Sequence, residues 1–166
     1  MWGAGGGGGG RGWGSGRGCA ANPILRNEVV TLEPLSPSHV DDLAAAVRDG
    51  ELWKAWYALI AAPEEWPAEV ERRLELQRTG QAAPWVIRRN DTGAVCGLTT
   101  YLNPAPEHRR LEIGSTWLAR SAQGTRVNPA AKLLLLTRAF ETLGCNVVEL
   151  RTHWHNHQSR AAIARL

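Results

Sequence analysis

Cysteine, methionine and phenylalanine are scarce in this chain of 166 residues, which contains three, one and one of them, respectively. The cysteines, Cys19, Cys96 and Cys145, are odd in number and lack the spacing of a zinc or redox motif. A disulfide scaffold is therefore not indicated, and we expect a reduced, cytoplasmic protein.

A long apolar run and an excess of one charge are also missing. No stretch is apolar enough to span a bilayer, and the N-terminal residues lack the apolar core of a signal peptide. The 19 basic and 16 acidic residues are scattered along the chain, so neither a membrane nor a nucleic-acid partner is favoured. A hydrophobic content of 43% allows one domain with a buried core.

Glycine, in contrast, is concentrated at the N-terminus. Residues 1 to about 22 are dominated by glycine and cannot bury enough surface to offset their backbone entropy. We expect residues 1–27 to form a disordered extension and residues 28–166 to form a single domain. An arginine/glycine arm that binds nucleic acid is the functional alternative, although Arg11 and Arg17 give it few arginines.

The hydrophobic pattern predicts both helices and strands after residue 28. Strands are expected at 29–33, 85–89, 94–102, 110–118 and 147–153, and helices at 36–48, 51–60, 67–78, 129–143 and 156–166. Asn90–Gly93 is a strong hairpin signal. Gly114, in the middle of a strand, predicts a bulge or the close approach of another backbone.

The loop at residues 123–128 precedes the helix at 129–143. Asn128 is a suitable N-cap, and Pro129 suits the first helical position. The expected buried stripe of this helix comprises Leu133, Leu136, Phe140 and Leu143. Free N–H groups at a helix N-terminus can bind phosphate or another anion, and an ordinary strand-to-helix turn is the alternative.

Three segments, Leu111–Leu118, Gln123–Lys132 and Asn156–Ser159, carry a resemblance to a known family. In their order and spacing they resemble the GNAT acetyltransferase superfamily, and more narrowly its RimJ/RimL-like branch of ribosomal-protein N-terminal acetyltransferases. The resemblance covers residues 28–166. It implies an α+β (mixed α/β) fold, in which helices flank a central, mostly antiparallel sheet and the fourth and fifth strands splay apart.

The resemblance also implies acetyl-CoA as co-substrate, with no metal. Its pyrophosphate would lie on the loop formed by Gln123, Gly124, Thr125, Arg126, Val127 and Asn128. Its pantetheine arm would pair with the strand at Thr116, Trp117 and Leu118 and contact Asn156. A bound amine would attack the thioester directly, without a covalent enzyme intermediate.

Two residues are candidates for the catalytic chemistry. Glu112 is expected on the same strand face as Gly114 and Thr116, where it would act through water as the base for an ammonium substrate. A solvated carboxylate is the alternative. Ser159 resembles a serine that this branch uses near the thiolate leaving group, and a plain first-turn helix serine is the alternative. The tyrosine general acid of many GNAT enzymes is replaced by Ile163.

Two departures from the family pattern count against activity. Arg126 stands where the family loop has glycine, and Asn128 where it has a small residue. A non-glycine residue in the left-handed region costs about 1–2 kcal/mol, so we expect weakened binding that Arg126→Gly would restore. Arg126 as an added phosphate ligand is the alternative. The chain also ends within its final helix, so the last strands of the family fold are expected to be missing, and an unpaired sheet edge favours self-association.

The expected acceptor is a primary amine such as a protein N-terminus. The alternatives are a small amine, such as a polyamine or an aminoglycoside, and a catalytically silent GNAT-like fragment. Four acidic residues, Glu64, Glu65, Glu69 and Glu71, hint at a cationic small substrate. The histidines 153, 155 and 157 are expected to line the acceptor side or cap a helix rather than bind zinc. Trp53, Trp56 and Trp66 are expected to pack in the core.

Overall fold

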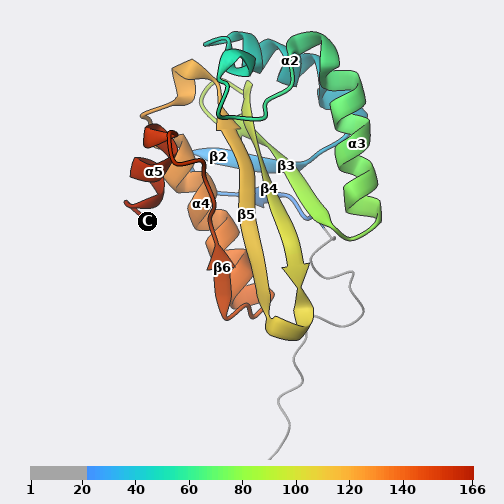
Figure 1. Ribbon diagram of the computed structural model, residues 1–166, viewed down its shortest axis with the longest axis vertical. Coiled ribbons are helices and arrows are strands. Elements are labelled where there is room, and N and C mark those ends of the chain that lie inside the picture. Colours follow the sequence, from blue (N-terminus) through green and yellow to red (C-terminus); the bar gives the residue numbers. More distant parts are fainter. Residues whose placement is uncertain (1–21) are drawn as a thin grey trace, which may run out of the picture.

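The computed structural model describes residues 22–166, which form an α+β fold around one six-stranded sheet (Figure 1). The strands follow each other in space as they do in sequence: β1 (Leu25–Arg26), β2 (Val30–Pro34), β3 (Ala82–Arg89), β4 (Val95–Ala105), β5 (Arg110–Leu118) and β6 (Val147–Glu149). Neighbouring strands are antiparallel except β5 and β6, which are parallel. The predicted fold class is confirmed.

Helices cover both faces of this sheet. The main helices are α2 (Val40–Arg48), α3 (Trp66–Arg78), α4 (Val127–Thr137) and α5 (His157–Ile163). The hydroxyl of Tyr101 on β4 donates to the Leu135 carbonyl of α4, whereas its neighbour Thr100 accepts from Arg73 of α3. Because successive strand side chains point to opposite faces, α3 and α4 lie on opposite sides of the sheet. Figure 1 shows α2 beside α3.

The expected helix at 51–60 is wrong. Only a short 3-10 turn forms at Leu52–Lys54, and an irregular loop follows. Gly50 and Glu51 have φ values of 95° and 49°, which break the right-handed path before the turn. Trp56 and Leu59 are exposed, so no buried surface holds a longer helix in place.

The helix after the loop is present, but its buried face differs from the prediction. It begins at Val127 rather than after an Asn128 cap, and a wider π turn at Arg138–Thr142 continues it. Leu133 and Phe140 are exposed, although Leu143 is buried as expected. The face against the sheet is formed by Val127, Ala131, Leu135 and Ala139. Apolar residues occur on several sides of this helix, so their spacing alone does not identify the buried face. The small side chains of Ala131 and Ala139 let the helix approach the sheet on the side that is buried.

The folded part begins earlier than residue 28. Leu25 and Arg26 pair with Leu32 and Thr31 as strand β1. The indole of Trp85 donates to the Pro23 carbonyl at 2.9 Å. The predicted disorder of residues 1–21 lies outside the described residues. Within residues 22–166, no helix is long and apolar enough to cross a bilayer.

Candidate active-site cleft

The parallel strands β5 and β6 meet only at one end. Their pairing comprises Arg110 with Val147, Leu111 with Val148 and Glu112 with Glu149. β6 then ends, whereas β5 continues to Leu118, so the two segments diverge. The predicted splaying is confirmed. A cleft of about 1020 Å³ fills the opening and is lined by β5, the loop before α4, the segment after β6, α5 and the loop at 50–60.

A bulge at Ser115 divides β5 into two parts. Leu98 pairs with Trp117 and Thr100 with Gly114, so Thr99 lies opposite both Ser115 and Thr116. Ser115 has a φ of 46°, as a residue forced out of the regular strand does. The bulge predicted at Gly114 is therefore present, one residue later, at Ser115.

The bulge reverses the orientation of the residues that follow it. Gly114 pairs with Thr100, which faces α3, but Thr116 accepts from the Lys132 ammonium of α4 at 2.9 Å. The expectation that Glu112, Gly114 and Thr116 share one face is therefore wrong. The extra residue at 115 shifts the alternation by one, so Glu112 and Gly114 face the α3 side and Thr116 faces the α4 side.

The loop before α4 has the properties of an anion site. Gly124 has a φ of 70°, a conformation that glycine adopts without strain but that strains other residues. Within residues 22–166, no hydrogen bond involves the backbone N–H of Gly124, Thr125, Arg126 or Asn128. The hydroxyl of Thr125 donates to the Ala122 carbonyl at 2.7 Å and holds the loop. The N–H groups are thus available at the positive end of α4.

Arg126 does not adopt the strained conformation expected of it. Its φ and ψ are −70° and −8°, in the right-handed helical region, and its side chain is exposed. The positive φ of the loop falls on Gly124 instead. The conformational argument for weakened binding is therefore wrong, because the backbone at 126 has no need for glycine.

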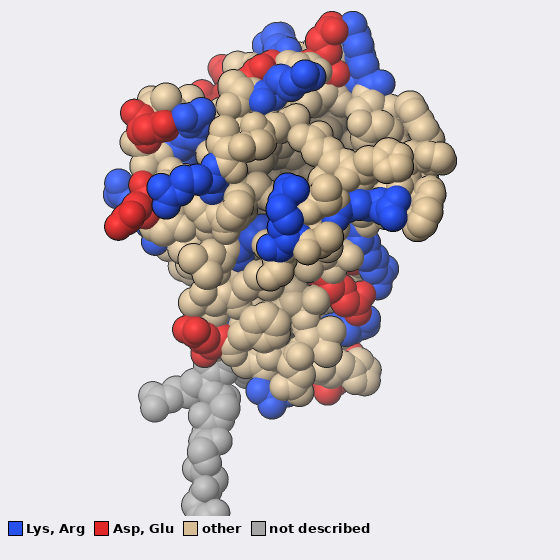
Figure 2. All heavy atoms as spheres, turned by 90° about the vertical axis from the view of Figure 1, so that its left-hand side faces the viewer, with Lys and Arg blue, Asp and Glu red and all other residues tan. Residues whose placement is uncertain are grey.

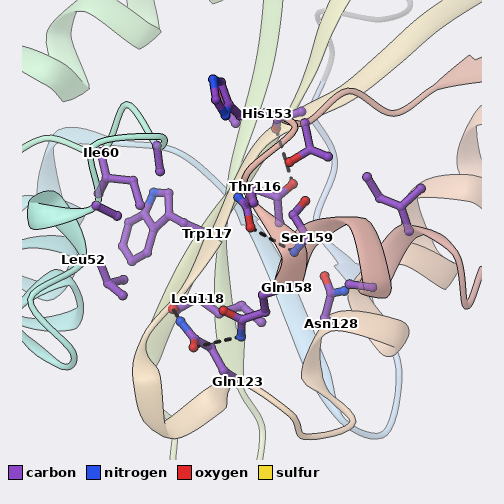
Figure 3. A pocket seen from close by; sticks show the side chains of 18 of the residues that line it. Leu52, Ile60, Thr116, Trp117, Leu118, Gln123, Asn128, His153, Gln158 and Ser159 are labelled. Atoms are coloured by element: carbon purple, nitrogen blue, oxygen red, sulfur yellow. Dashed lines mark hydrogen bonds between the residues drawn. The ribbon is translucent and has the colours of Figure 1, made fainter.

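The start of α5 closes one side of the cleft. Asn156 caps this helix as predicted, and its side-chain oxygen accepts from the Ser159 N–H at 3.0 Å. Gln158 donates to Gln123 at 3.0 Å, which ties α5 to the loop before α4 (Figure 3). Figure 3 shows Gln123, Gln158 and Ser159 grouped opposite Leu52, Ile60 and Trp117.

Most of the predicted site residues line this cleft. They are Thr116, Trp117, Leu118, Gln123, Gly124, Thr125, Asn128, Asn156 and Ser159. Arg126 and Glu112 are not part of the lining, and Val127 is buried in the core.

Glu112 lies directly behind the cleft wall. A Cβ added at Gly114 would stand 3.0 Å from Glu112 Oε1, so the carboxylate lies over that glycine. Glu112 is 8% exposed, accepts from the Asn103 amide at 3.0 Å and lies 3.6 Å from Arg151 Nε. Because Gly114 has no side chain, only its backbone lies between this buried carboxylate and the cleft.

The α3 side of the cleft carries a buried arginine that the sequence did not single out. Arg73 Nε donates to Glu69 at 2.7 Å, and Nη1 donates to Thr100 at 3.3 Å. Burial lowers the pKa of Arg73, and Glu69 opposes this effect. Trp66, as expected, is buried, and its ring packs 5.4 Å from that of Trp117.

Aromatic side chains cluster where the loop at 50–60 meets the segment after β6. Trp56 is 74% exposed, contrary to the expected core position, and its ring lies 5.4 Å from that of His153 and 5.5 Å from that of His155. The two imidazoles stack at 5.6 Å. No group of metal-binding side chains large enough to hold an ion occurs among the described residues. Of the three histidines expected on the acceptor side or at a helix cap, His153 lines the cleft, whereas His155 and His157 are not part of its lining.

Lys132 is a second site residue that sequence reasoning missed. It lies one helical turn after Asn128, and both residues line the cleft. Lys132 is 5% exposed, and burial lowers its pKa to about 8. The spacing from Asn128 contained this signal, but the predicted buried stripe of Leu133, Leu136, Phe140 and Leu143 did not include Lys132.

The cleft lining is mostly basic. Its cationic residues are Lys54, Arg73, Arg120, Lys132, Arg151 and Arg165, and its acidic residue is Glu51. Figure 2 shows basic side chains across the middle of this face and acidic ones toward its margins. Such a lining suits an anionic ligand.

The comparisons with known proteins agree with this geometry. The model of the acetyltransferase (GNAT) domain matches residues 30–166. The chain therefore belongs to the GNAT acetyltransferase family.

Its relatives include ribosomal-protein acetyltransferases. A Bacillus subtilis (strain 168) protein described as "Putative ribosomal N-acetyltransferase YdaF" is 35% identical over 74 residues, which are 45% of this chain and 40% of that protein. A GCN5-related N-acetyltransferase from Brucella melitensis superposes with a TM-score of 0.75 at 28% identity, over 87% of this chain and 66% of the other. RimL, a ribosomal L7/L12 alpha-N-protein acetyltransferase in complex with coenzyme A, shares the fold with a TM-score of 0.73 at 20% identity, over 86% of this chain and 82% of the other.

Proposed function

We propose that this protein transfers an acetyl group from acetyl-CoA to a primary amine, and that the acceptor is a protein N-terminal amine. One observation carries the proposal: the opening between β5 and β6 leads directly to the free N–H groups of the loop at 123–128. A long anionic ligand can therefore bind by its phosphates at one end and reach the sheet interior with the other.

The residues on the α4 side would hold the co-substrate, which supplies the activated acetyl thioester. Gly124, Thr125 and Asn128 would donate backbone N–H groups to the pyrophosphate. The backbone at 116–118 and the side chain of Asn156 would hold the pantetheine arm.

The α3 side would receive the amine. Glu112, over Gly114, would remove a proton from the ammonium group through a water molecule. Ser159, which lines the opposite wall, would hydrogen-bond at the leaving sulfur. Arg73 is held between Glu69 and Thr100 and would fix the wall between these two groups.

The nature of the acceptor rests on the relatives and on the charge of the cleft. YdaF is described as a putative ribosomal N-acetyltransferase, and RimL as a ribosomal L7/L12 alpha-N-protein acetyltransferase. The four acidic residues that hinted at a cationic small amine do not line the cleft, and Glu69 is paired with Arg72 and Arg73. These positions favour a protein N-terminus over a polyamine.

Two linked measurements test the proposal. Calorimetry with acetyl-CoA should show one binding site per chain, and mass spectrometry should show acetylation of peptides with a free N-terminus but not of the same peptides with a blocked one. Binding without any transfer would instead favour a catalytically silent member of the family. Faster transfer to spermidine than to every peptide would favour the small-amine alternative.

A further inference from the structure

Lys132 is a buried cation without a carboxylate partner. Its ammonium donates to Thr116 Oγ1 at 2.9 Å, and it forms no salt bridge with any residue in 22–166. Burying an ammonium group without a carboxylate partner lowers the free energy of unfolding, so a role in the cleft would explain why this lysine is there. Burial is also the cause that lowers the pKa of Lys132 to about 8.

Thr116 connects this ammonium to the open cleft. Its oxygen accepts from Lys132 and lies 2.8 Å from Thr99 Oγ1 and 3.4 Å from the Gly114 carbonyl. Since the oxygen already accepts from Lys132, its own hydrogen is free to rotate among Thr99, Gly114 and the cleft. A proton can thus pass from Lys132 to Thr116 and from Thr116 to a ligand atom.

Other groups in the cleft lining are poorer proton donors for the α4 side. The arginines remain protonated throughout the physiological pH range and do not release a proton. Lys54 is exposed and paired with Glu51. The ring of His153 stacks on that of His155 and meets the ring of Trp56 edge to face.

On the basis of the proposed function, we propose that Lys132, acting through the hydroxyl of Thr116, protonates the thiolate that leaves when the acetyl group is transferred. The amine nitrogen forms a bond to the carbonyl carbon, and the carbon–sulfur bond breaks with its electron pair on sulfur. Thr116 gives its hydroxyl proton to that sulfur and takes one from Lys132. The acceptor ammonium loses one proton to the base before the attack, and its nitrogen loses a second proton to solvent as the amide forms. The neutral Lys132 amine regains a proton from solvent.

The surroundings of Lys132 support this role. The charged side chains that share its cleft are those of Glu51, Lys54, Arg73, Arg120, Arg151 and Arg165. None contributes to its lowered pKa, for which burial is the cause. A donor with a pKa close to that of a thiol, about 8.5, transfers its proton without a large energy gap.

The test is the ionisation of CoA on the protein, followed by the ultraviolet absorbance of its thiolate with desulfo-CoA as the blank. The thiol of bound CoA should titrate lower on the unmodified protein than on Lys132→Met, by about one pH unit or more, because a nearby cation stabilises the thiolate. Acetyl transfer by Lys132→Met should fall by about 100-fold or more.

Three further variants separate charge from proton transfer. Lys132→Arg should keep the low thiol titration yet stay slow, since arginine does not release a proton. Thr116→Val should also keep the low titration and slow transfer, because the path is broken while the cation remains. Lys54→Met, which removes a cleft charge that does not contact Thr116, should leave the thiol titration unchanged.

The thiol titration distinguishes this inference from the proposed function. Identical titrations for the unmodified protein and Lys132→Met, in a chain that binds CoA and transfers acetyl groups, would overturn the inference alone. Absence of CoA binding by the unmodified protein would overturn the proposed function and this inference together. Thermal melting of each variant with and without CoA shows that it is folded and binds.

Discussion

The two sides of the cleft are built differently. On the α4 side, Thr116 and Lys132 are held in a partly buried hydrogen-bond network, and the loop before α4 is fixed by Thr125 and Gln123. On the α3 side, the loop at 50–60 has little regular structure, and Trp56 is mostly exposed. One wall is thus preorganised, whereas the mouth of the other is a surface loop.

This contrast matches the two ligands of the proposed reaction. The co-substrate is the same in every reaction cycle, so a cleft wall that already has the geometry of the bound state favours its binding. No free energy is then lost in ordering that wall. A polypeptide acceptor needs an open mouth with aromatic and imidazole surfaces that can adapt to it. The account therefore predicts that changes on the α4 side affect CoA and that changes at the mouth affect the acceptor.

The largest expected effect on stability comes from Lys132→Met. The pKa of Lys132 is lowered to about 8, below that of an unfolded lysine, so the unfolded chain binds more protons between about pH 8 and pH 10.4. Stability of the unmodified protein should therefore rise with pH across this window. The variant should lack this rise and be more stable at pH 7, by up to about 3 kcal/mol. Denaturant unfolding at several pH values measures both, and equal slopes for the two proteins would contradict a buried lysine.

A smaller effect is expected from Gly124→Val. A side chain at a φ of 70° costs about 1–2 kcal/mol, which the loop can relieve only by leaving its phosphate-binding shape. Acetyl-CoA should bind about tenfold more weakly by calorimetry. Gly80→Val is the matched control, since Gly80 has a φ of 75°, open space around its Cβ position and no place in the cleft lining. It should lose similar stability but keep its affinity for acetyl-CoA, and equal losses of affinity would break the comparison.

Trp56→Ala should act on the other side alone. Because Trp56 is 74% exposed, its removal should change the free energy of unfolding by less than about 0.5 kcal/mol. The KM for an N-terminal peptide should rise several-fold, and the Kd for acetyl-CoA should stay constant. A parallel loss of both affinities would show that the two sides of the cleft are not separate.

The smallest effect is expected from Arg126→Gly. Arg126 is exposed and helical, so glycine relieves no strain there, and the Kd for acetyl-CoA should change by less than about twofold. A tenfold tightening by calorimetry would restore the earlier expectation that Arg126 obstructs the phosphates.

The fold was largely predictable because its elements have strong local signals. The bounds of β5 were predicted as residues 110–118, and Gly114 indicated the bulge beside it. Asn156 was recognised as a helix cap from its residue type and position. These features depend on nearby residues, so a single sequence contains them.

What the sequence could not predict depends on tertiary contacts. The spacing of Leu52, Trp56 and Leu59 indicated a helix, but only Leu52 packs against the core, and Trp56 and Leu59 are exposed. The extra residue at Ser115 turned Thr116 toward α4, which brought Lys132 into the cleft and separated both from Glu112. The conformation of Arg126 likewise follows from where the loop enters α4, two residues earlier than expected.

The most direct test of the account is the response of backbone amides to CoA in nuclear magnetic resonance spectra. On addition of CoA, the signals of Gly124, Thr125, Arg126 and Asn128 should move, together with those of residues 116–118, because these amides bind the phosphates and the pantetheine arm. The indole signal of Trp56 and the amides of the loop at 50–60 should change least. Shifts centred on that loop, with the amides at 124–128 unmoved at saturating CoA, would contradict the central claim that the α4 side of the cleft is the CoA site.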